Sequence, residues 1–206
     1  MKRFRTLLAA VALVSMAAPA LAAPEKFVID PVHSQAAFTI RHFFSNVTGR
    51  FAQMSGTIQF DQQNLAGSSV DVTIPAASIT TQNDRRDNHL KSPDFFAADS
   101  FPNVTFKSTK VVPGTGGNFQ IEGDLTMRGV TKKVTLDATL LGVGSVGQMG
   151  TRAGWEAKTK VNRKDYGINW NRTLDQGGTL LGDDVAISIS IEAAKEEPKK
   201  DAAPAK

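Results

Sequence analysis

The chain has 206 residues, of which 41% are hydrophobic and 21% charged, and its formal net charge at pH 7 is +4. It contains no cysteine. Disulfides, cysteine-ligated metals and thiol nucleophiles are therefore excluded, and stability has to come from the burial of apolar side chains.

The first 22 residues have the pattern of a secretory signal peptide. A basic start with Lys2, Arg3 and Arg5 precedes an apolar run, and Ala20-Leu21-Ala22 fits a signal peptidase site. We expect cleavage after Ala22, export to a bacterial periplasm, and a mature chain whose net charge falls from +4 to +1 with the loss of these three basic residues. Such a nearly neutral chain has no electrostatic footprint for nucleic acid. A membrane anchor is the alternative, but Pro19 and the cleavage pattern argue against stable membrane insertion.

Alternation of apolar and polar residues predicts antiparallel strands through most of the remaining chain. In one example, Val70, Val72 and Ile74 alternate with polar neighbours. The expected strands, about eight or nine in number, cover 27–30, 34–42, 51–60, 69–74, 104–112, 119–128, 134–140, 155–161 and 185–191. The glycine-rich segments 113–118 and 142–150 are expected to be turns between them.

The expected fold is all-β, an extended antiparallel eight-stranded barrel with a short helical connection. A sandwich has the same alternation, but long strands with one apolar face need closure, and no helix is available to cover their edges. An outer-membrane barrel also alternates. It would need aromatic girdles, however, and the chain has one tyrosine and two tryptophans.

A long connection, residues 81–101, interrupts the strand pattern. Thr81 and Asp84 have the spacing of a capping box and predict the start of a short helix that Pro93 ends. We expect this connection to fold over the barrel as a plug. Three phenylalanines would enter the core or the barrel interior, and three polar residues would either brace the plug or, for Arg86 and His89, hold a ligand head group: Phe95, Phe96 and Phe101; Arg86, Asp87 and His89.

Several motifs of other protein classes fail on their context. Residues 142–147 match G-x-G-x-x-G, but a strand pattern follows instead of a phosphate-binding helix. Nucleophile elbows, P-loops and H-E-x-x-H do not occur. A metal site of His33, His42 and His89 with Asp30 or Asp87 is not required by their spacing, so no metal and no catalytic residue is expected. An enzyme with His42 or His89 as general base and Asp87 as orienting group is a less favoured alternative.

Five ordered segments resemble the YceI-like family. They are FVIDPVHSQAAFTIRH (27–42), RRDNHLKSPDFF with the following FPNVTFKST (85–109), GDLTMRGVTKKVTL (123–136), NRKDYGI (162–168) and GDDVAISISIE (182–192). The resemblance implies a lipocalin-like barrel in the periplasm, with an apolar tunnel that holds a long isoprenoid, such as an isoprenoid quinone or polyprenyl phosphate, or a similar amphiphile. It implies no cofactor. Tyr166 stands where the family pattern has phenylalanine, which would place a hydroxyl near the tunnel opening.

The inward positions of the strands supply candidate ligand-binding residues. Phe38 and Ile40 form an apolar row that ends at His42, and a second row from Trp155 to Val161 leads to Arg163. A polar group at the end of an apolar row suits an amphiphile. Arg163 could instead form an ion pair with Asp165 or Asp87 at the rim. The full set of expected ligand-binding residues is Phe38, Ile40, His42, Ile58, Phe60, Val72, Phe95, Phe96, Phe106, Leu125, Met127, Trp155, Val161, Arg163 and Tyr166.

The sequence thus predicts a barrel domain over 23–192, followed by a disordered charged tail over 193–206, which is rich in Ala, Lys, Glu and Pro. The expected function is that of a soluble periplasmic carrier for an isoprenoid lipid, with a homodimer possible through an open seam. The competing hypothesis is a stress or interaction protein whose barrel is filled by its own side chains and whose partners bind the outer face or the tail.

Overall fold

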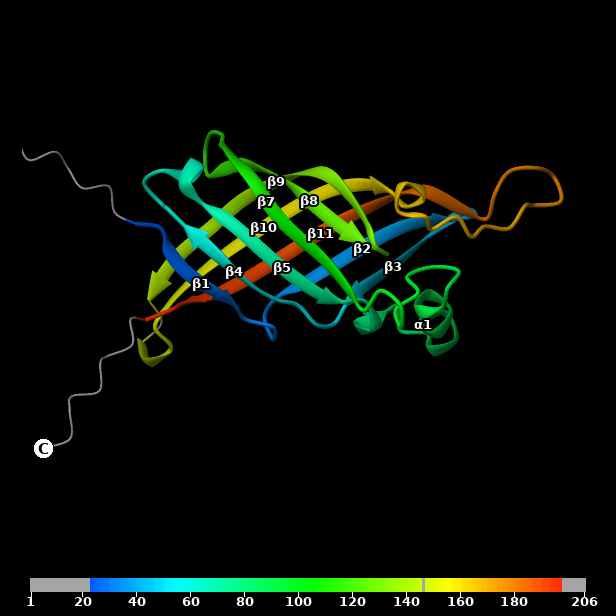
Figure 1. The fold of residues 1–206 in the computed structure, drawn as a ribbon, viewed down its shortest axis with the longest axis horizontal. Helices are drawn as coiled ribbons and strands as arrows, with labels where there is room; N and C mark the ends of the chain where they lie inside the picture. The colour runs from blue at the N-terminus through cyan, green and yellow to red at the C-terminus, as the bar shows by residue number, and fades with distance from the viewer. Residues whose placement is uncertain (1–22, 146, 198–206) are drawn as a thin grey trace, which may run out of the picture.

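The computed structural model describes residues 23–145 and 147–197, and these residues form a closed antiparallel barrel (Figure 1). The expected signal peptide and the last nine residues of the expected tail lie outside the described residues. The strands are β1 (Glu25–Ile29), β2 (Gln35–His42), β3 (Ser45–Phe51), β4 (Ser55–Phe60), β5 (Ser69–Pro75), β6 (Ile79–Thr80), β7 (Asn103–Pro113), β8 (Asn118–Met127), β9 (Val130–Ser145), β10 (Thr151–Asn162) and β11 (Leu181–Lys195). The helices of the described residues are α1 (Asp84–Lys91) and four short 3-10 turns: η1 (Leu65–Gly67), η2 (Ala76–Ser78), η3 (Gly147–Met149) and η4 (Arg163–Tyr166).

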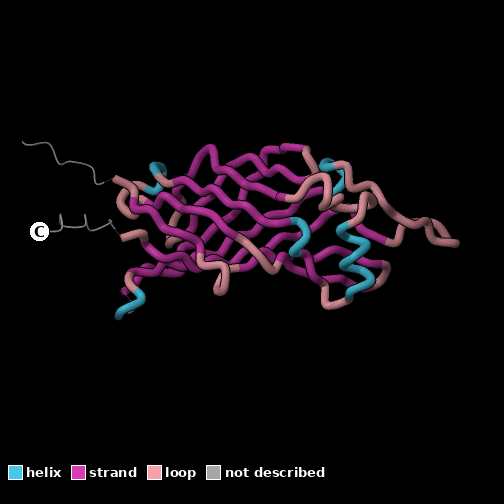
Figure 2. Tube along the Cα trace, turned by 60° about the horizontal axis from the view of Figure 1, so that its bottom comes forward, coloured by secondary structure: helices cyan, strands magenta, loops and turns pink. Residues whose placement is uncertain are grey.

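Eight strand positions form the wall of the barrel, as the sequence predicts. Five of them are the continuous strands β7 to β11, and the other three are interrupted, so that β1 continues as β2, β3 as β4, and β5 as β6. The ring closes at β11, which pairs with β2 over Leu181–Ser190 and with β1 over Ala193–Lys195. Figure 2 shows the strands inclined to the long axis, with the helices at its two ends.

The alternation seen in the sequence determines which side chains enter the barrel. In β8, Phe119 and Ile121 are buried while Gln120 between them is exposed. One end of the interior is closed by three aromatic rings packed edge to face, those of Phe27, Phe60 and Trp155, with centroids 5.4–6.1 Å apart. Phe27 is completely buried.

Two predicted boundaries are wrong. The strand expected over 51–60 is divided at residues 52–54, where Met54 turns into the core, and the preceding strand β3 was not predicted. The expected disordered tail starts too early, because β11 continues to Lys195 and Ala193 is completely buried against β1. The turns over 113–118 and 142–150 are confirmed as hairpin connections, although β9 extends into the second one as far as Ser145.

No helix within residues 23–145 and 147–197 has the length and apolar character needed to cross a membrane. Two partly separate groups of buried side chains fill the space between the wall and the connections. The first surrounds the three aromatic rings at the closed end. The second lies under α1 and η4 and contains Phe95, Met127, Tyr166 and Leu181.

Candidate ligand-binding cavity

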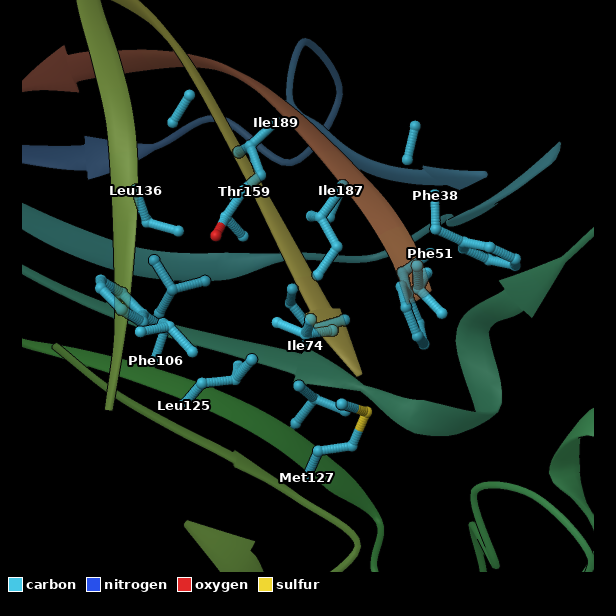
Figure 3. A pocket seen from close by; sticks show the side chains of 18 of the residues that line it. Phe38, Phe51, Ile74, Phe106, Leu125, Met127, Leu136, Thr159, Ile187 and Ile189 are labelled. Carbon is cyan, nitrogen blue, oxygen red and sulfur yellow. The ribbon is translucent and has the colours of Figure 1, made fainter. Parts of the chain in front are cut away.

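The barrel encloses an elongated cavity with a volume of about 640 Å³. Its walls are inward-facing side chains from nearly every strand, and they are overwhelmingly apolar (Figure 3). The side chains labelled in Figure 3 are Phe38, Phe51, Ile74, Phe106, Leu125, Met127, Leu136, Thr159, Ile187 and Ile189. The interior is therefore not filled by the protein's own side chains, and the filled-barrel hypothesis is not supported.

The basic groups that line the cavity gather at the end opposite the aromatic closure, whereas Ser68 and Glu156 line it nearer to that closure. Arg85, Arg86 and His89 come from α1, His42 ends the apolar row of β2, and Arg163 follows the end of β10. Because Arg85 both lines the cavity and is exposed, the cavity reaches the surface at this end. An apolar chamber with basic groups at one mouth suits a ligand with a long hydrocarbon chain and a polar head.

A buried carboxylate fixes the connection that carries α1. Asp87 accepts hydrogen bonds from the backbone N–H and the hydroxyl of Thr81 and from the hydroxyl of Thr80. Burial raises the pKa of Asp87, but these hydrogen bonds outweigh it and hold the pKa below its ordinary value. Asp87 does not line the cavity, and so the bracing role expected for it agrees with its position.

The expected capping box of Thr81 and Asp84 is wrong. Asn83 is the N-cap, with its side-chain oxygen accepting the N–H of Arg86 at 3.0 Å. Thr81 instead accepts the guanidinium Nε of Arg86 at 2.7 Å, and its carbonyl accepts Nη2 of Arg86 at 3.1 Å. Arg86 therefore braces the connection through its hydrogen bonds to Thr81, and its side chain also lines the mouth of the cavity.

Arg163 is the most deeply buried cation among the described residues, with 3% of its surface exposed. It donates to the carbonyls of Gly182, Ile168 and Trp170 at 2.8–2.9 Å and reaches the carboxylate of Asp183 at 3.3 Å. The partners expected from the sequence, Asp165 and Asp87, are wrong. Burial lowers the pKa of Arg163, and the charge of Asp183 opposes that shift.

Aromatic rings surround the mouth. His89, Phe95 and Trp170 form a cluster with ring centroids 5.0–5.3 Å apart, and Phe96 packs edge to face on Phe51 at 5.5 Å. Trp170 belongs to the loop that Arg163 holds through its carbonyls. The contact between Trp170 and His89 packs this loop against α1 beside the cavity.

Nearly all of the predicted ligand-binding residues line the cavity, from Phe38 through Arg163, with Tyr166 as the exception. Tyr166 is 2% exposed and lies in the core beneath the mouth, and its hydroxyl oxygen has no hydrogen-bond partner. Burial raises the pKa of this phenol to about 12, with a smaller contribution from the charge of Asp165. Phe101, expected inside, is 36% exposed and packs against Gly129 on the outside.

Sequence reasoning missed several cavity residues. Phe51 is the last residue of β3 and not the first of the strand expected over 51–60, while Trp170 and Leu180 lie in a loop without periodicity. The alternation over 185–191 is the sequence signal that identifies Ile187 as inward-facing.

The polar clusters that would support an enzyme or a metal site are not assembled as proposed. The Nε2 atom of His89 lies 2.8 Å from Asp94 and not beside Asp87, so the expected pair of base and orienting carboxylate is not formed. His33 binds Asp30 at 3.1 Å, where Arg152 also binds the same carboxylate at 2.9 Å. Asp30, His33 and Arg152 therefore form an ion-pair network centred on the Asp30 carboxylate.

Comparison with known proteins identifies the family. The model of the YceI-like domain matches residues 27–193. Protein YceI of Escherichia coli is 38% identical over 186 residues, which cover 90% of this chain and 94% of that protein. The protein plu2095 of Photorhabdus laumondii, named only as a UPF0312 protein, is 40% identical over 183 residues, covering 88% and 93%.

Solved structures share the fold. BcnA of Burkholderia cenocepacia aligns with a TM-score of 0.72 at 22% identity, covering 81% of this chain and 99% of BcnA. A domain from Saccharophagus degradans, described as a polyisoprenoid binding domain, aligns with a TM-score of 0.59 at 16% identity, covering 84% and 99%. Fold and sequence agree, and the chain belongs to the YceI-like family.

Proposed function

We propose that this protein is a periplasmic binding protein that carries a long-chain isoprenoid lipid, or an amphiphile of similar shape, inside the barrel. The observation that carries the proposal is the cavity itself, about 640 Å³ of apolar space with its basic groups confined to one mouth. This volume lies within the range of about 300–1,000 Å³ that ligand pockets occupy. The polyisoprenoid binding described for the Saccharophagus domain supports the same ligand class.

The energetics favour a hydrocarbon chain. Each isoprene unit places roughly four hydrocarbon groups in the cavity at about 0.8 kcal/mol each, so one unit contributes on the order of 3 kcal/mol before ordering costs. Two or three units would therefore anchor a molecule. The head group would lie among Arg85, Arg86 and His42 at the mouth, where a phosphate or a quinone oxygen can accept hydrogen bonds.

The test is native mass spectrometry of the protein purified from a periplasmic extract without detergent, followed by solvent extraction. A stoichiometric isoprenoid or other long-chain mass supports the proposal and identifies the head group. An apo mass, together with failure to bind added quinones and polyprenyl phosphates, contradicts it.

A matched pair of variants tests the location of the ligand. Ile187 points into the cavity beside Thr159 and Phe38, whereas its neighbour Ser188 is exposed on the outer face. Ile187→Trp should reduce ligand occupancy at least tenfold because the indole takes the space of the chain. Ser188→Trp adds the same ring outside and should leave occupancy unchanged. Equal occupancy in both variants, with both folded by circular dichroism, would place the ligand elsewhere.

A further inference from the structure

The hairpin between β2 and β3 exposes two phenylalanines at the tip of the barrel. Phe44 is 88% exposed and Phe43 is 39% exposed, and their ring centroids lie 3.8 Å apart. Replacing an exposed apolar side chain at a hairpin tip by a polar one costs the fold no stability. The packing of the barrel therefore does not explain why two phenylalanines stand here.

The backbone of this tip makes the choice of residue more unusual. His42 pairs with Ser45, so Phe43 and Phe44 are the two central residues of a two-residue turn. Phe43 has φ 53°, in the left-handed region where turns of this length prefer glycine, asparagine or aspartate. A bulky residue that is both strained and exposed breaks two local rules at once, and such violations concentrate at functional sites.

The tip lies beside the mouth of the cavity. His42, immediately before it, lines the cavity, and the N–H of Phe43 donates to the carbonyl of Leu180, another lining residue, at 2.7 Å. In Figure 1 the β2–β3 hairpin, α1 and the long loop before β11 all lie at the same end of the barrel. The aromatic tip therefore projects from the end through which a ligand would enter.

Basic residues flank the tip. Arg41 is exposed on the strand before it, and the carbonyl of Arg172 accepts the N–H of Leu180 at 2.9 Å, which places the Arg172 backbone next to the residue that the tip binds. Neither guanidinium forms an ion pair within the described part of the chain. The nearby acids Asp183 and Asp184 are bound by lysines or by Arg163, and Asp175 is exposed at the far turn of the loop.

We propose that Phe43 and Phe44 form a membrane-docking tip that inserts into the interfacial region of an anionic phospholipid bilayer and brings the cavity mouth to the lipid. Aromatic rings partition into the boundary between head groups and acyl chains, and arginines beside them meet the anionic head groups. Membrane docking by the tip is a property beyond the carrier function, which rests on the cavity.

The experiment measures binding of the purified protein to vesicles of phosphatidylglycerol and phosphatidylethanolamine by co-sedimentation. The test variant is Phe43→Gly with Phe44→Ser, which should fold at least as well as the wild type because glycine suits the turn. The control is Met149→Ser, which removes a 61% exposed apolar side chain from η3 at the opposite end of the barrel. We expect about a tenfold or greater loss of vesicle binding for the tip variant and none for the control.

A second measurement locates the tip directly. The wild type, with Trp155 and Trp170, gives the background emission. In Phe44→Trp, emission should shift further to the blue and be quenched more strongly by brominated lipids than in the wild type when vesicles are added, whereas Met149→Trp should add nothing to the response of the wild type. Wild-type protein that does not bind these vesicles, a Phe44→Trp that is quenched no more than the wild type, or a tip variant that instead loses a dimer in analytical ultracentrifugation would each overturn the proposal.

The carrier function is followed separately in the same samples, by mass spectrometry of the bound ligand. A tip variant that keeps its ligand but loses vesicle binding supports docking independently of cargo. Vesicle binding by a wild-type protein that carries no lipid and binds no added quinone or polyprenyl phosphate would instead reject the carrier function and leave the docking tip supported.

Discussion

Tyr166→Phe should stabilise this protein, although it removes a polar group. Tyr166 is 2% exposed, and its hydroxyl has no partner in the described structure. A buried, unsatisfied polar group costs about 1–3 kcal/mol, and phenylalanine keeps the ring packing. We expect the free energy of unfolding to rise by about 1–2 kcal/mol in urea denaturation, and the melting temperature by about 2–8 °C.

The pKa of the same hydroxyl can be measured directly because Tyr166 is the only tyrosine of the chain. Burial raises its pKa from 10.0 to about 12, so the unfolded chain releases this proton at lower pH than the folded chain does. The stability that depends on the neutral phenol is complete below pH 10 and is lost as the pH rises toward 12. Over this window the wild type should lose roughly 3 kcal/mol more than Tyr166→Phe.

Two results would refute this reasoning. The first is a Tyr166→Phe variant less stable than the wild type by more than about 1 kcal/mol, which would mean that the hydroxyl has a partner such as water or ligand. The second is phenol titration near pH 10 in the folded protein, followed by ultraviolet absorbance. Measuring the stability difference between Tyr166→Phe and the wild type in ligand-free and in loaded protein distinguishes the two partners, because only a ligand partner makes the difference depend on loading.

Other predictions concern ion pairs of Arg163 and Asp30. Arg163→Met should destabilise the protein by about 3–5 kcal/mol in urea denaturation, because the carbonyls of Ile168, Trp170 and Gly182 lose their donor, and Arg163→Lys should recover only part of the loss. The pKa of Asp30 is lowered to about 2, first by His33 and then by the Val32 N–H and Arg152. Its contribution to stability is therefore present above pH 4 and lost as the pH falls toward 2, and Asp30→Asn should flatten that part of the acid unfolding curve.

The barrel could be predicted from the sequence because alternation of apolar and polar residues, as over β8 or β11, is a property of neighbouring residues. In a barrel with an apolar interior, this alternation determines which side chains point inward. This is why a set of cavity residues chosen by parity, from Phe38 to Val161, lines the observed cavity. The resemblance to the YceI-like family added the ligand class that parity does not supply.

What failed depends on distant contacts. Arg163 binds Asp183 and three carbonyls because η4 and the following loop bring them together, and Asp165 is nearer only along the chain. The predicted strand is interrupted between Phe51 and Ser55, where the chain turns and buries the side chain of Met54 in the core. The paired phenylalanines at 43 and 44 are visible in the sequence, but only the φ angle of Phe43 and the exposure of both rings show that they do not belong to the core.

The closure of the ring at β11 has a consequence for how the molecule folds. Phe27 pairs with Lys195, and Lys26 forms an ion pair with Glu196 at 2.9 Å, so the wall is sealed by residues near opposite ends of the described chain. Contacts between such distant residues are formed late and slow the folding of barrels. Until β11 has been added, β1, β2 and β10 all lack a neighbour, and the lumen opens to water along its whole length. The apolar interior can therefore be sealed from water only when this final strand is in place.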